Sequence, residues 1–184
     1  MKRLLVTLCA LALVFACKES VAQKQKMKAE KVSMKEKGMD NISYPYTAMY
    51  SSDFKIGNPG DAKLVLDLWK DYDDNAFDRH DLFADTAVMF LADGTVIRGK
   101  DSIVAGAKQF RGALSSSMST LDAWVPLKSV DKNENWVALW GTETDAWPDG
   151  KTAKRDIHEI WRINKDGKVD FMKQFQSKPA EMQQ

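Results

Sequence analysis

Apolar residues recur at helical spacing in two parts of the chain and alternate with polar residues in the others. The helical spacing begins after Asp61, which is suited to cap a helix through residue 74. A second, short helix is predicted over residues 77–83, and a third after Asp101, which is again suited as its cap. The apolar face of the first helix would hold Leu64, Val65, Leu68, Trp69 and Tyr72, with Asp67, Lys70, Asp71 and Asp74 facing water.

The remaining pattern predicts strands. Residues 86–91 and 95–98 would form a hairpin across Asp93-Gly94, because glycine readily takes the positive φ that tight turns need. Longer strands are predicted over residues 121–130, 136–144, 153–164 and 169–176. On the second of these, Trp136 and Trp140 share one face with Ala138, so Val137 and Leu139 take the other.

The order of elements predicts an α+β domain over residues 61–178, with three helices packed on one face of a curved antiparallel sheet. About 120 residues suffice for a single core. Residues 41–60 are rich in aromatic side chains and are expected to form an arm packed on the domain. Residues 179–184 would be a C-terminal tail.

The N-terminus has the pattern of a targeting segment. Residues 1–16 combine a basic start with a short apolar run that ends at Cys17, typical of a lipoprotein signal peptide. We expect a lipid anchor on Cys17, a Lys-rich flexible tether over residues 17–40, and an exported protein held at a membrane of the cell envelope. Cleavage after Ala22, which would give a soluble periplasmic or secreted protein, is the alternative. Since Cys9 and Cys17 are the only cysteines, the domain has no disulfide.

Charge and motifs exclude several classes of function. The chain has 27 basic and 26 acidic residues, and this near-neutral balance gives no support for a nucleic-acid partner. Phosphate-binding and dinucleotide-binding glycine motifs are missing, and only two histidines occur, so we expect neither a cofactor nor a metal.

Two stretches of the chain resemble one family. Residues 82–103, reading LFADTAVMFLADGTVIRGKDSI, are similar to the centre of SnoaL-like domains, which belong to the nuclear-transport-factor-2-like superfamily. The stretch from Ile157 to Ile163, reading IHEIWRI, and the turn DGKV at residues 166–169 are similar to the last hairpin of that family. The resemblance covers residues 61–177. It implies a cone-shaped fold with one internal pocket, and a homodimer.

The ketosteroid isomerases are catalytic members of the same superfamily, and their functional positions transfer only in part. The resemblance puts their early-strand base at Leu91 and their tyrosine near Leu68 or Trp69, where the required groups are missing. Their acid position falls near Glu159, and Asp93 is a displaced candidate for the base.

His158 and Glu159 are adjacent on one predicted strand, so only one of them can face the pocket. With Glu159 inside, Trp161 and Ile163 join it; in the other register His158, Ile160 and Arg162 point inward. Catalytic candidates are Glu159, His158 and Asp93. Candidates for contact with a ligand are Trp69, Tyr72, Phe90, Arg98, Trp140 and Trp161.

Three functions fit these residues. The first is binding of a small apolar or aromatic molecule in the pocket. The alternative is a general acid–base enzyme, a SnoaL-like cyclase, isomerase or hydrolase, which needs two ionisable groups in one cavity. The second alternative is a dimeric interaction module whose pocket is filled by its own side chains.

Overall fold

The computed structural model of the protein describes residues 43–51 and 53–178. The predicted signal peptide, Cys17, the tether and the C-terminal tail lie outside these residues. The part of the chain from Ala48 onward forms one compact unit, to which the following description is confined. Within the described residues, no helix is both long enough and apolar enough to cross a membrane.

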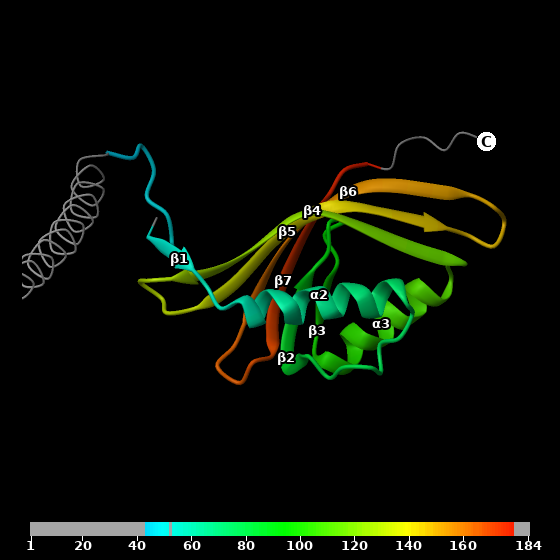
Figure 1. Ribbon diagram of the computed structural model, residues 1–184, viewed down its shortest axis with the longest axis horizontal. Helices are drawn as coiled ribbons and strands as arrows, with labels where there is room; N and C mark the ends of the chain where they lie inside the picture. Colours follow the sequence, from blue (N-terminus) through cyan, green and yellow to red (C-terminus); the bar gives the residue numbers. More distant parts are fainter. Residues whose placement is uncertain (1–42, 52, 179–184) are drawn as a thin grey trace, which may run out of the picture. The chain divides into compact units, whose positions relative to one another are not determined.

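A single seven-stranded sheet forms one layer of the unit, and both of its described helices lie on the same side of it (Figure 1). The strand order is β1-β4-β5-β6-β7-β2-β3. The strands are β1 (Phe54–Ile56), β2 (Phe83–Phe90), β3 (Val96–Arg98), β4 (Ser116–Ser129), β5 (Asn135–Ala146), β6 (Thr152–Ile163) and β7 (Val169–Gln176).

The predicted α+β class and curved sheet are confirmed, but the sheet is mixed rather than wholly antiparallel. The strands β4 to β7 form the expected antiparallel meander, because short polar turns join them. β2 instead lies parallel to β7, with Met89 opposite Met172. The hairpin between β2 and β3 forms as predicted, with Gly94 at φ 91°.

α2 (Pro59–Asp73) begins two residues, and α3 (Lys100–Gly112) one residue, before its predicted cap. α2 is capped by Asn58, whose Oδ1 accepts a hydrogen bond from the Gly60 amide at 3.0 Å. Pro59 at the first helical position suits this start, because its missing N–H would be unpaired there in any residue. α3 follows Gly99 and has no side-chain cap. Asp61 and Asp101 therefore lie inside the first turns, and their predicted roles as caps are wrong.

The predicted helix over residues 77–83 does not form, so the described part of the chain has two helices rather than three. Residues 74–82 are an irregular loop between α2 and β2. Ion pairs to distant elements hold this loop: Asp78 contacts Lys108 of α3 at 2.5 Å, and Asp81 contacts Lys168 at 2.9 Å. A helix of seven residues is marginal by itself, so the weak helical pattern of this segment is not sufficient to form one.

Close approach of β4 and β5 requires the glycine at position 141. The register of the two strands shifts between Leu121 and Ala123. A Cβ at position 141 would overlap the Thr120 carbonyl oxygen and lie 2.9 Å from the Leu121 Cα. Any larger residue there would push the strands apart at the irregularity, which is where sheets typically bend.

The core lies between α2 and the central strands. It contains Ala62 and Val65 of α2, Val137 and Leu139 of β5, and residues of β6 and β7. The predicted alternation on β5 is confirmed, since Val137 and Leu139 are buried whereas Trp136 and Trp140 lie on the other face. The face that carries Val137 and Leu139 is termed the inner face below, and the opposite one the outer face.

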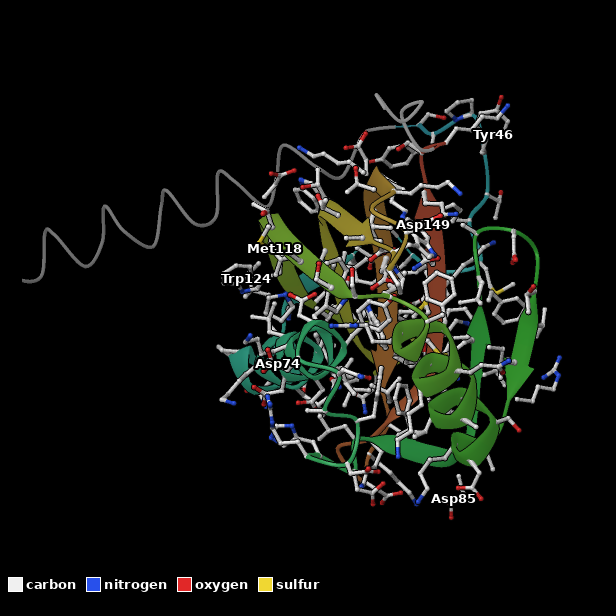
Figure 2. All side chains as sticks on the ribbon, turned by 90° about the vertical axis from the view of Figure 1, so that its right-hand side faces the viewer. Tyr46, Asp74, Asp85, Met118, Trp124 and Asp149 are labelled. Carbon is white, nitrogen blue, oxygen red and sulfur yellow. The ribbon has the colours of Figure 1, made fainter. Side chains whose placement is uncertain are left out.

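The aromatic segment before the first helix contributes an edge strand. β1 pairs with residues 127–129 of β4, and the Tyr50 hydroxyl donates a hydrogen bond to Glu134 at 2.7 Å. Beyond this short pairing, β4 is the exposed edge of the sheet. Met118 and Trp124 on β4 remain largely exposed there (Figure 2).

Candidate functional site

A cavity of about 320 Å³ lies between the inner face of the sheet and both helices. Most of its wall is apolar or aromatic, which suits a ligand of similar character. The apolar and aromatic residues that line it are Leu68, Trp69, Tyr72, Phe77, Phe83, Met89, Leu91, Ile97, Ile103, Val104, Phe110, Trp161 and Met172. The described part of the protein therefore has an open interior, in contrast to the hypothesis of a pocket filled by its own side chains.

Glu159 of β6 is the deepest ionisable group in this wall, with 4% of its surface exposed. It lies opposite Leu139 of β5 and therefore on the inner face. Its Oε2 accepts hydrogen bonds from Trp69 Nε1 at 2.8 Å and Trp161 Nε1 at 3.0 Å. Its Oε1 accepts one from Gln174 Nε2 at 2.9 Å. Three donors from α2, β6 and β7 thus fix this carboxyl group.

Two opposing effects act on Glu159. Burial raises its pKa, because an apolar surrounding disfavours the charged form, whereas the three hydrogen bonds lower it. Burial is the stronger effect, and the pKa is raised overall. No cation pairs with Glu159 among the described residues. A ligand in the cavity would therefore meet an acidic group whose orientation is already set.

A second polar region lies farther along the same strands. Ser119 of β4, Glu143 of β5 and Arg155 of β6 are register partners in one row across the inner face, and all three line the cavity. Glu143 lies four residues beyond Leu139, so the rows of Glu143 and Glu159 are roughly 13 Å apart along the strands.

Arg155 is held mainly by an acid beside Glu143. The fully buried Asp145 forms an ion pair with Arg155 Nη2 and accepts a hydrogen bond from Ser117 at 2.7 Å. The Glu143 carboxyl reaches only Arg155 Nε, at 3.5 Å, and this nitrogen is buried without a hydrogen-bond partner. Arg155 is thus engaged with Asp145, and Glu143 is left with the weaker contact.

The pKa of Glu143 is raised to about 8. Burial is the largest cause, and the neighbouring Asp145 carboxylate raises the pKa further, whereas Arg155 lowers it. At pH 7 the group is therefore mainly protonated in the empty cavity. An acid whose pKa lies near neutrality can both give and take a proton.

The structure brings four of the sequence-predicted residues to the cavity with Glu159. Trp69, Tyr72 and Trp161 line it, and Asp93 lies at the wall in the β2–β3 turn. The Asp93 carboxylate accepts a hydrogen bond from the Thr95 amide at 2.8 Å, and this bond lowers its pKa. Asp93 is therefore ionised and committed to the turn. Leu91, expected at the position of the isomerase base, lines the cavity, as do Leu68 and Trp69, the two positions expected near the isomerase tyrosine.

His158 and Trp140 lie on the outer face, away from the cavity. His158 pairs in register with Trp140, and their rings are 5.9 Å apart; Phe175 follows at 6.3 Å on the other side. The register that places Glu159, Trp161 and Ile163 inside is the one adopted. The prediction of Trp140 as a pocket wall is wrong, because its strand face is set by the burial of Leu139.

Phe90 and Arg98 are likewise not among the residues that line the cavity. The Phe90 ring packs on Phe171 at 5.5 Å, and Arg98 ends β3 with an exposed side chain. Both alternate with residues of the opposite face, since Met89 and Ile97 line the cavity instead. The expected contacts of Phe90 and Arg98 with a ligand therefore do not form in the cavity described here.

Sequence reasoning missed Glu143, Arg155, Ser119 and Gln174. The sequence did contain a signal for two of them. Glu143 is an even number of positions from Leu139 on β5, and Arg155 is an even number from Glu159 on β6, so the two residues of each pair share a strand face. Charged residues near strand ends are usually assigned to solvent. The inner face continues past the core, and the cavity keeps these groups out of bulk water.

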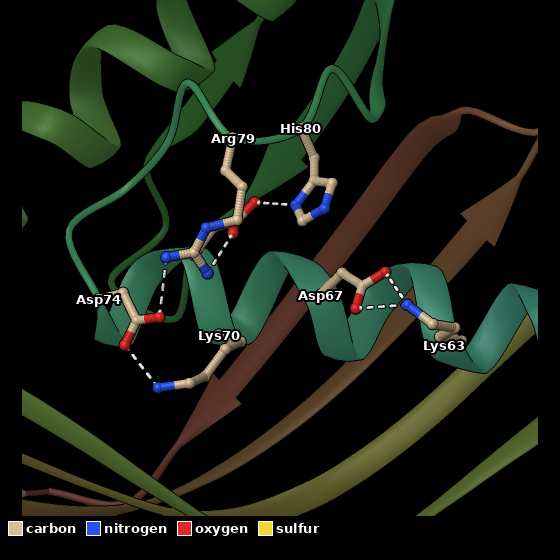
Figure 3. A network of polar contacts seen from close by, with 7 residues as sticks. Lys63, Asp67, Lys70, Asp74, Arg79 and His80 are labelled. Atoms are coloured by element: carbon tan, nitrogen blue, oxygen red, sulfur yellow. Dashed lines mark hydrogen bonds and ion pairs between the residues drawn. The ribbon is translucent and has the colours of Figure 1, made fainter.

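Asp71, expected on the wet side of α2, is instead buried under the loop of residues 74–82. Its side chain is 2% exposed and contacts His80 Nδ1 at 2.7 Å and Arg79 at 3.3 Å (Figure 3). Arg79 also pairs with Asp74 at 3.0 Å. These contacts fix the loop that carries Phe77, and so help to position one wall of the cavity.

Metal-binding geometry is not found in the described residues, where no three His, Cys, Asp or Glu side chains are grouped closely enough to hold an ion. The charged and other polar side chains that line the cavity, besides Tyr72 and the tryptophans, are Asp93, Ser119, Glu143, Arg155, Glu159, Gln174 and Gln176.

Comparison with known proteins identifies the fold. No protein-family model and no curated protein matches the sequence. Among solved structures, an epoxide hydrolase of the LEH type from M. tuberculosis superimposes with a TM-score of 0.54 at 12% identity, over 65% of this chain and 84% of that one. A putative SnoaL-like polyketide cyclase from Jannaschia sp. gives 0.54 at 14% identity, over 69% and 92%.

A Δ5-3-ketosteroid isomerase from Mycobacterium sp. gives a TM-score of 0.53 at 17% identity, over 63% of this chain and 92% of that one. These identities are too low to transfer an activity, and the matched proteins differ in their chemistry. They agree in architecture, in which helices pack on a curved sheet. The chain therefore has the cone-shaped fold of the SnoaL-like and nuclear-transport-factor-2-like proteins.

Proposed function

We propose that this protein binds a small, largely apolar or aromatic molecule in the cavity between the sheet and the two helices. The observation that carries the proposal is the cavity itself, with about 320 Å³ of free space and a wall dominated by aromatic and aliphatic side chains. Apolar cavities lower stability, because their lining atoms lose packing contacts, and a ligand that fills the cavity restores those contacts.

Glu159 would orient the ligand. Trp69, Trp161 and Gln174 already hold its carboxyl group, so a ligand meets a fixed polar point in an apolar wall. Preorganisation of this kind spares the ligand the cost of ordering the side chain on binding.

Native mass spectrometry of the full chain, purified from cells of its own kind, tests the proposal. We expect a retained small-molecule mass on the wild-type protein. In A107W, a tryptophan on α3 would enter the cavity, because Ala107 lines it, and the mass should disappear. The matched control is A105W, since Ala105 lies on the exposed side of the same helix. A mass that persists in A107W, or a protein empty in all three forms, would contradict the proposal.

A second function is favoured by one further observation: two carboxyl groups with raised pKa values, Glu159 and Glu143, line the same cavity. We propose general acid–base catalysis as the alternative, in which Glu143 exchanges the proton because its pKa of about 8 suits neutral conditions. Proton removal beside a carbonyl group is the step to examine first.

Exchange of the α-hydrogens of 4-phenylbutan-2-one in D₂O, followed by NMR, tests this alternative. Catalysis predicts faster exchange with wild-type protein and the background rate with E143Q. Binding of the ketone without any acceleration would leave the protein a binder rather than a catalyst.

We propose in addition that the protein is exported and anchored through an acyl group on Cys17, and that it forms homodimers. The sequence of residues 1–17 supports the first part, and the exposed aromatic rings of Trp140 and Phe175 on the outer face support the second. Metabolic labelling with a radioactive fatty acid should mark the wild-type chain and not C17A. If neither chain is labelled and the mature protein begins at Gln23, cleavage takes place after Ala22 instead.

A further inference from the structure

The row of Ser119, Glu143 and Arg155 has no role in fixing Glu159, yet it lines the same cavity. All other carboxyl groups on the inner face of β4 to β7 have clear partners. Glu159 accepts three hydrogen bonds, and Asp145 accepts one from Ser117 and pairs with Arg155. The Glu143 carboxyl accepts no hydrogen bond from any described residue and has only the 3.5 Å contact with Arg155 Nε.

The Glu143 carboxyl group therefore lacks a hydrogen-bond donor among the described residues. The Glu143 side chain is 15% exposed, and its exposed part faces the cavity, where it is one of the lining residues. Leaving such a group without a partner in a poorly solvated site costs free energy. A ligand that brings a hydrogen-bond donor to Glu143 would remove this cost.

The charges around Glu143 favour a cationic donor. Asp145 on β5, Glu159 on β6 and Asp73 on α2 all act on it as like charges, whereas Arg155 is its one opposing charge among the leading influences. Arg111 of α3 also lies at this end of α2, but its guanidinium donates to the carbonyl oxygens of Tyr72, Asp73 and Leu114.

The adjacent wall is compatible with a cation that carries an apolar group. The aromatic rings of Tyr72, Phe77 and Phe110 line the cavity together with Glu143. Aromatic faces attract ammonium groups, and the same rings bury the apolar part of an amine.

We propose that the cavity is specific for an apolar primary amine, whose ammonium group pairs with the carboxylate of Glu143 while its apolar body contacts the aromatic wall. This inference rests on the proposed binding function and assigns the ligand its chemical class. Glu143 is the residue that determines the specificity, and Glu159 remains the fixed polar point deeper in the cavity.

Isothermal titration calorimetry of the full chain with 4-phenylbutan-1-amine and 4-phenylbutan-1-ol tests the inference. The two probes share an apolar body and differ in the charged donor. Wild-type protein should bind the amine at least about tenfold more tightly than the alcohol, as expected for a charge-assisted hydrogen bond. In E143Q the two affinities should become similar.

A second readout follows from the protonation of Glu143 in the empty cavity. Pairing with an ammonium group requires the carboxylate, so amine binding at pH 7 should release about one proton per molecule. Titrations in buffers of different ionisation enthalpy measure this release. The alcohol should release none, and E143Q should release none with either probe.

The control for the replacement of a carboxyl group by an amide is D85N. Asp85 is largely exposed on β2, at the lower end of the molecule as seen in Figure 2, and it does not line the cavity. D85N should keep both the preference for the amine and the proton release. Circular dichroism and a thermal melt establish that E143Q is folded.

The outcomes separate the two proposals. Equal binding of amine and alcohol by wild-type protein would overturn the inference while leaving the binding function intact. A preference for the amine that persists in E143Q would also overturn it, because another group would then recognise the cation. Failure of both probes to bind would contradict the binding function and the inference together.

Discussion

The two faces of the strands β5 and β6 are built from alternate residues of the same sequence, yet they serve different purposes. On the inner face, Glu159 and Trp161 are buried, and the glutamate is fixed by N–H donors. On the outer face, the neighbouring His158 is exposed and meets the Trp140 ring edge to face. One residue step along a strand thus separates a buried polar site from a surface aromatic cluster.

The two faces also differ in how their charged side chains are paired. On the outer face Arg162 pairs with Asp170 at 2.8 Å and lies 5.7 Å from the Trp136 ring centroid. On the inner face, Glu143 has a single long contact with Arg155 Nε. Partner groups and water satisfy the outer charges, whereas the inner face leaves one carboxyl group available to a ligand.

The largest contrast is expected between two tryptophans on opposite faces. Trp161 is 4% exposed and Trp140 41% exposed. W161A should lower the free energy of unfolding by about 3–5 kcal/mol, because a large buried ring leaves a void. W140A should lower it by less than about 1 kcal/mol. Urea denaturation followed by circular dichroism measures both. Equal losses would show that the inner face is not the core of the domain.

The second contrast concerns the adjacent pair Glu159 and His158. E159A would leave the indole N–H groups of Trp69 and Trp161 without their acceptor, together with the Gln174 amide. We expect a loss of about 2–3 kcal/mol from these unpaired donors. H158A removes only an exposed ring contact and should cost less than about 1 kcal/mol. Wild-type stability of E159A would contradict the assigned hydrogen bonds.

A third prediction concerns the contribution of Glu143 to the pH dependence of stability. Its pKa in the folded protein is about 8, against an ordinary value of 4.5 for a glutamate in water. A raised pKa means that the unfolded state binds fewer protons between these values, so the contribution of Glu143 to stability is largest below about pH 4.5 and is lost as pH rises through 8.

E143Q should remove this part of the pH dependence. The difference in unfolding free energy between E143Q and wild type should change by about 4 kcal/mol in favour of the variant between pH 5 and pH 9. Chemical denaturation across this pH range measures it, and D85N serves as the exposed control. A pH-independent difference would show that Glu143 is ionised throughout.

The smallest effect is expected on the outer face. R162M removes the ion pairs of Arg162 with Asp170 and Glu134 but keeps an apolar side chain against Trp136 and Phe171. Partly exposed ion pairs contribute little, so the loss should be below about 1 kcal/mol. It should shrink further at high salt, because screening weakens the wild-type pairs. A loss as large as that of E159A would remove the distinction between the faces.

Much of the fold followed from the alternation of polar and apolar residues. The β4–β7 meander, the Asp93-Gly94 hairpin and the shared face of Trp136 and Trp140 were predictable, because each depends on residues close in sequence. The parallel pairing of β2 with β7 was not, since their contact joins residues more than 80 positions apart. The loop of residues 74–82 was missed for the same reason, because distant lysines hold it.

The candidate site was predictable only in its centre. Glu159, Trp69 and Trp161 were identified as candidates, but the sequence left open whether Glu159 or His158 faces inward. That choice depends on which strand face α2 covers, and this is a tertiary feature. Glu143 and Arg155 alternate in step with the inner-face residues of their strands. No pattern in the neighbouring sequence shows that the cavity extends to their row.

The most direct measurement is a crystal structure of the full chain soaked with 4-(4-bromophenyl)butan-1-amine, in which bromine gives an anomalous signal. The proposed function predicts a bromine peak inside the cavity, among Trp69, Phe83 and Trp161, and the inferred specificity for amines directs the nitrogen toward Glu143. A peak beside Trp140 and Phe175, with the cavity unchanged, would place binding on the outer face and contradict the central claim.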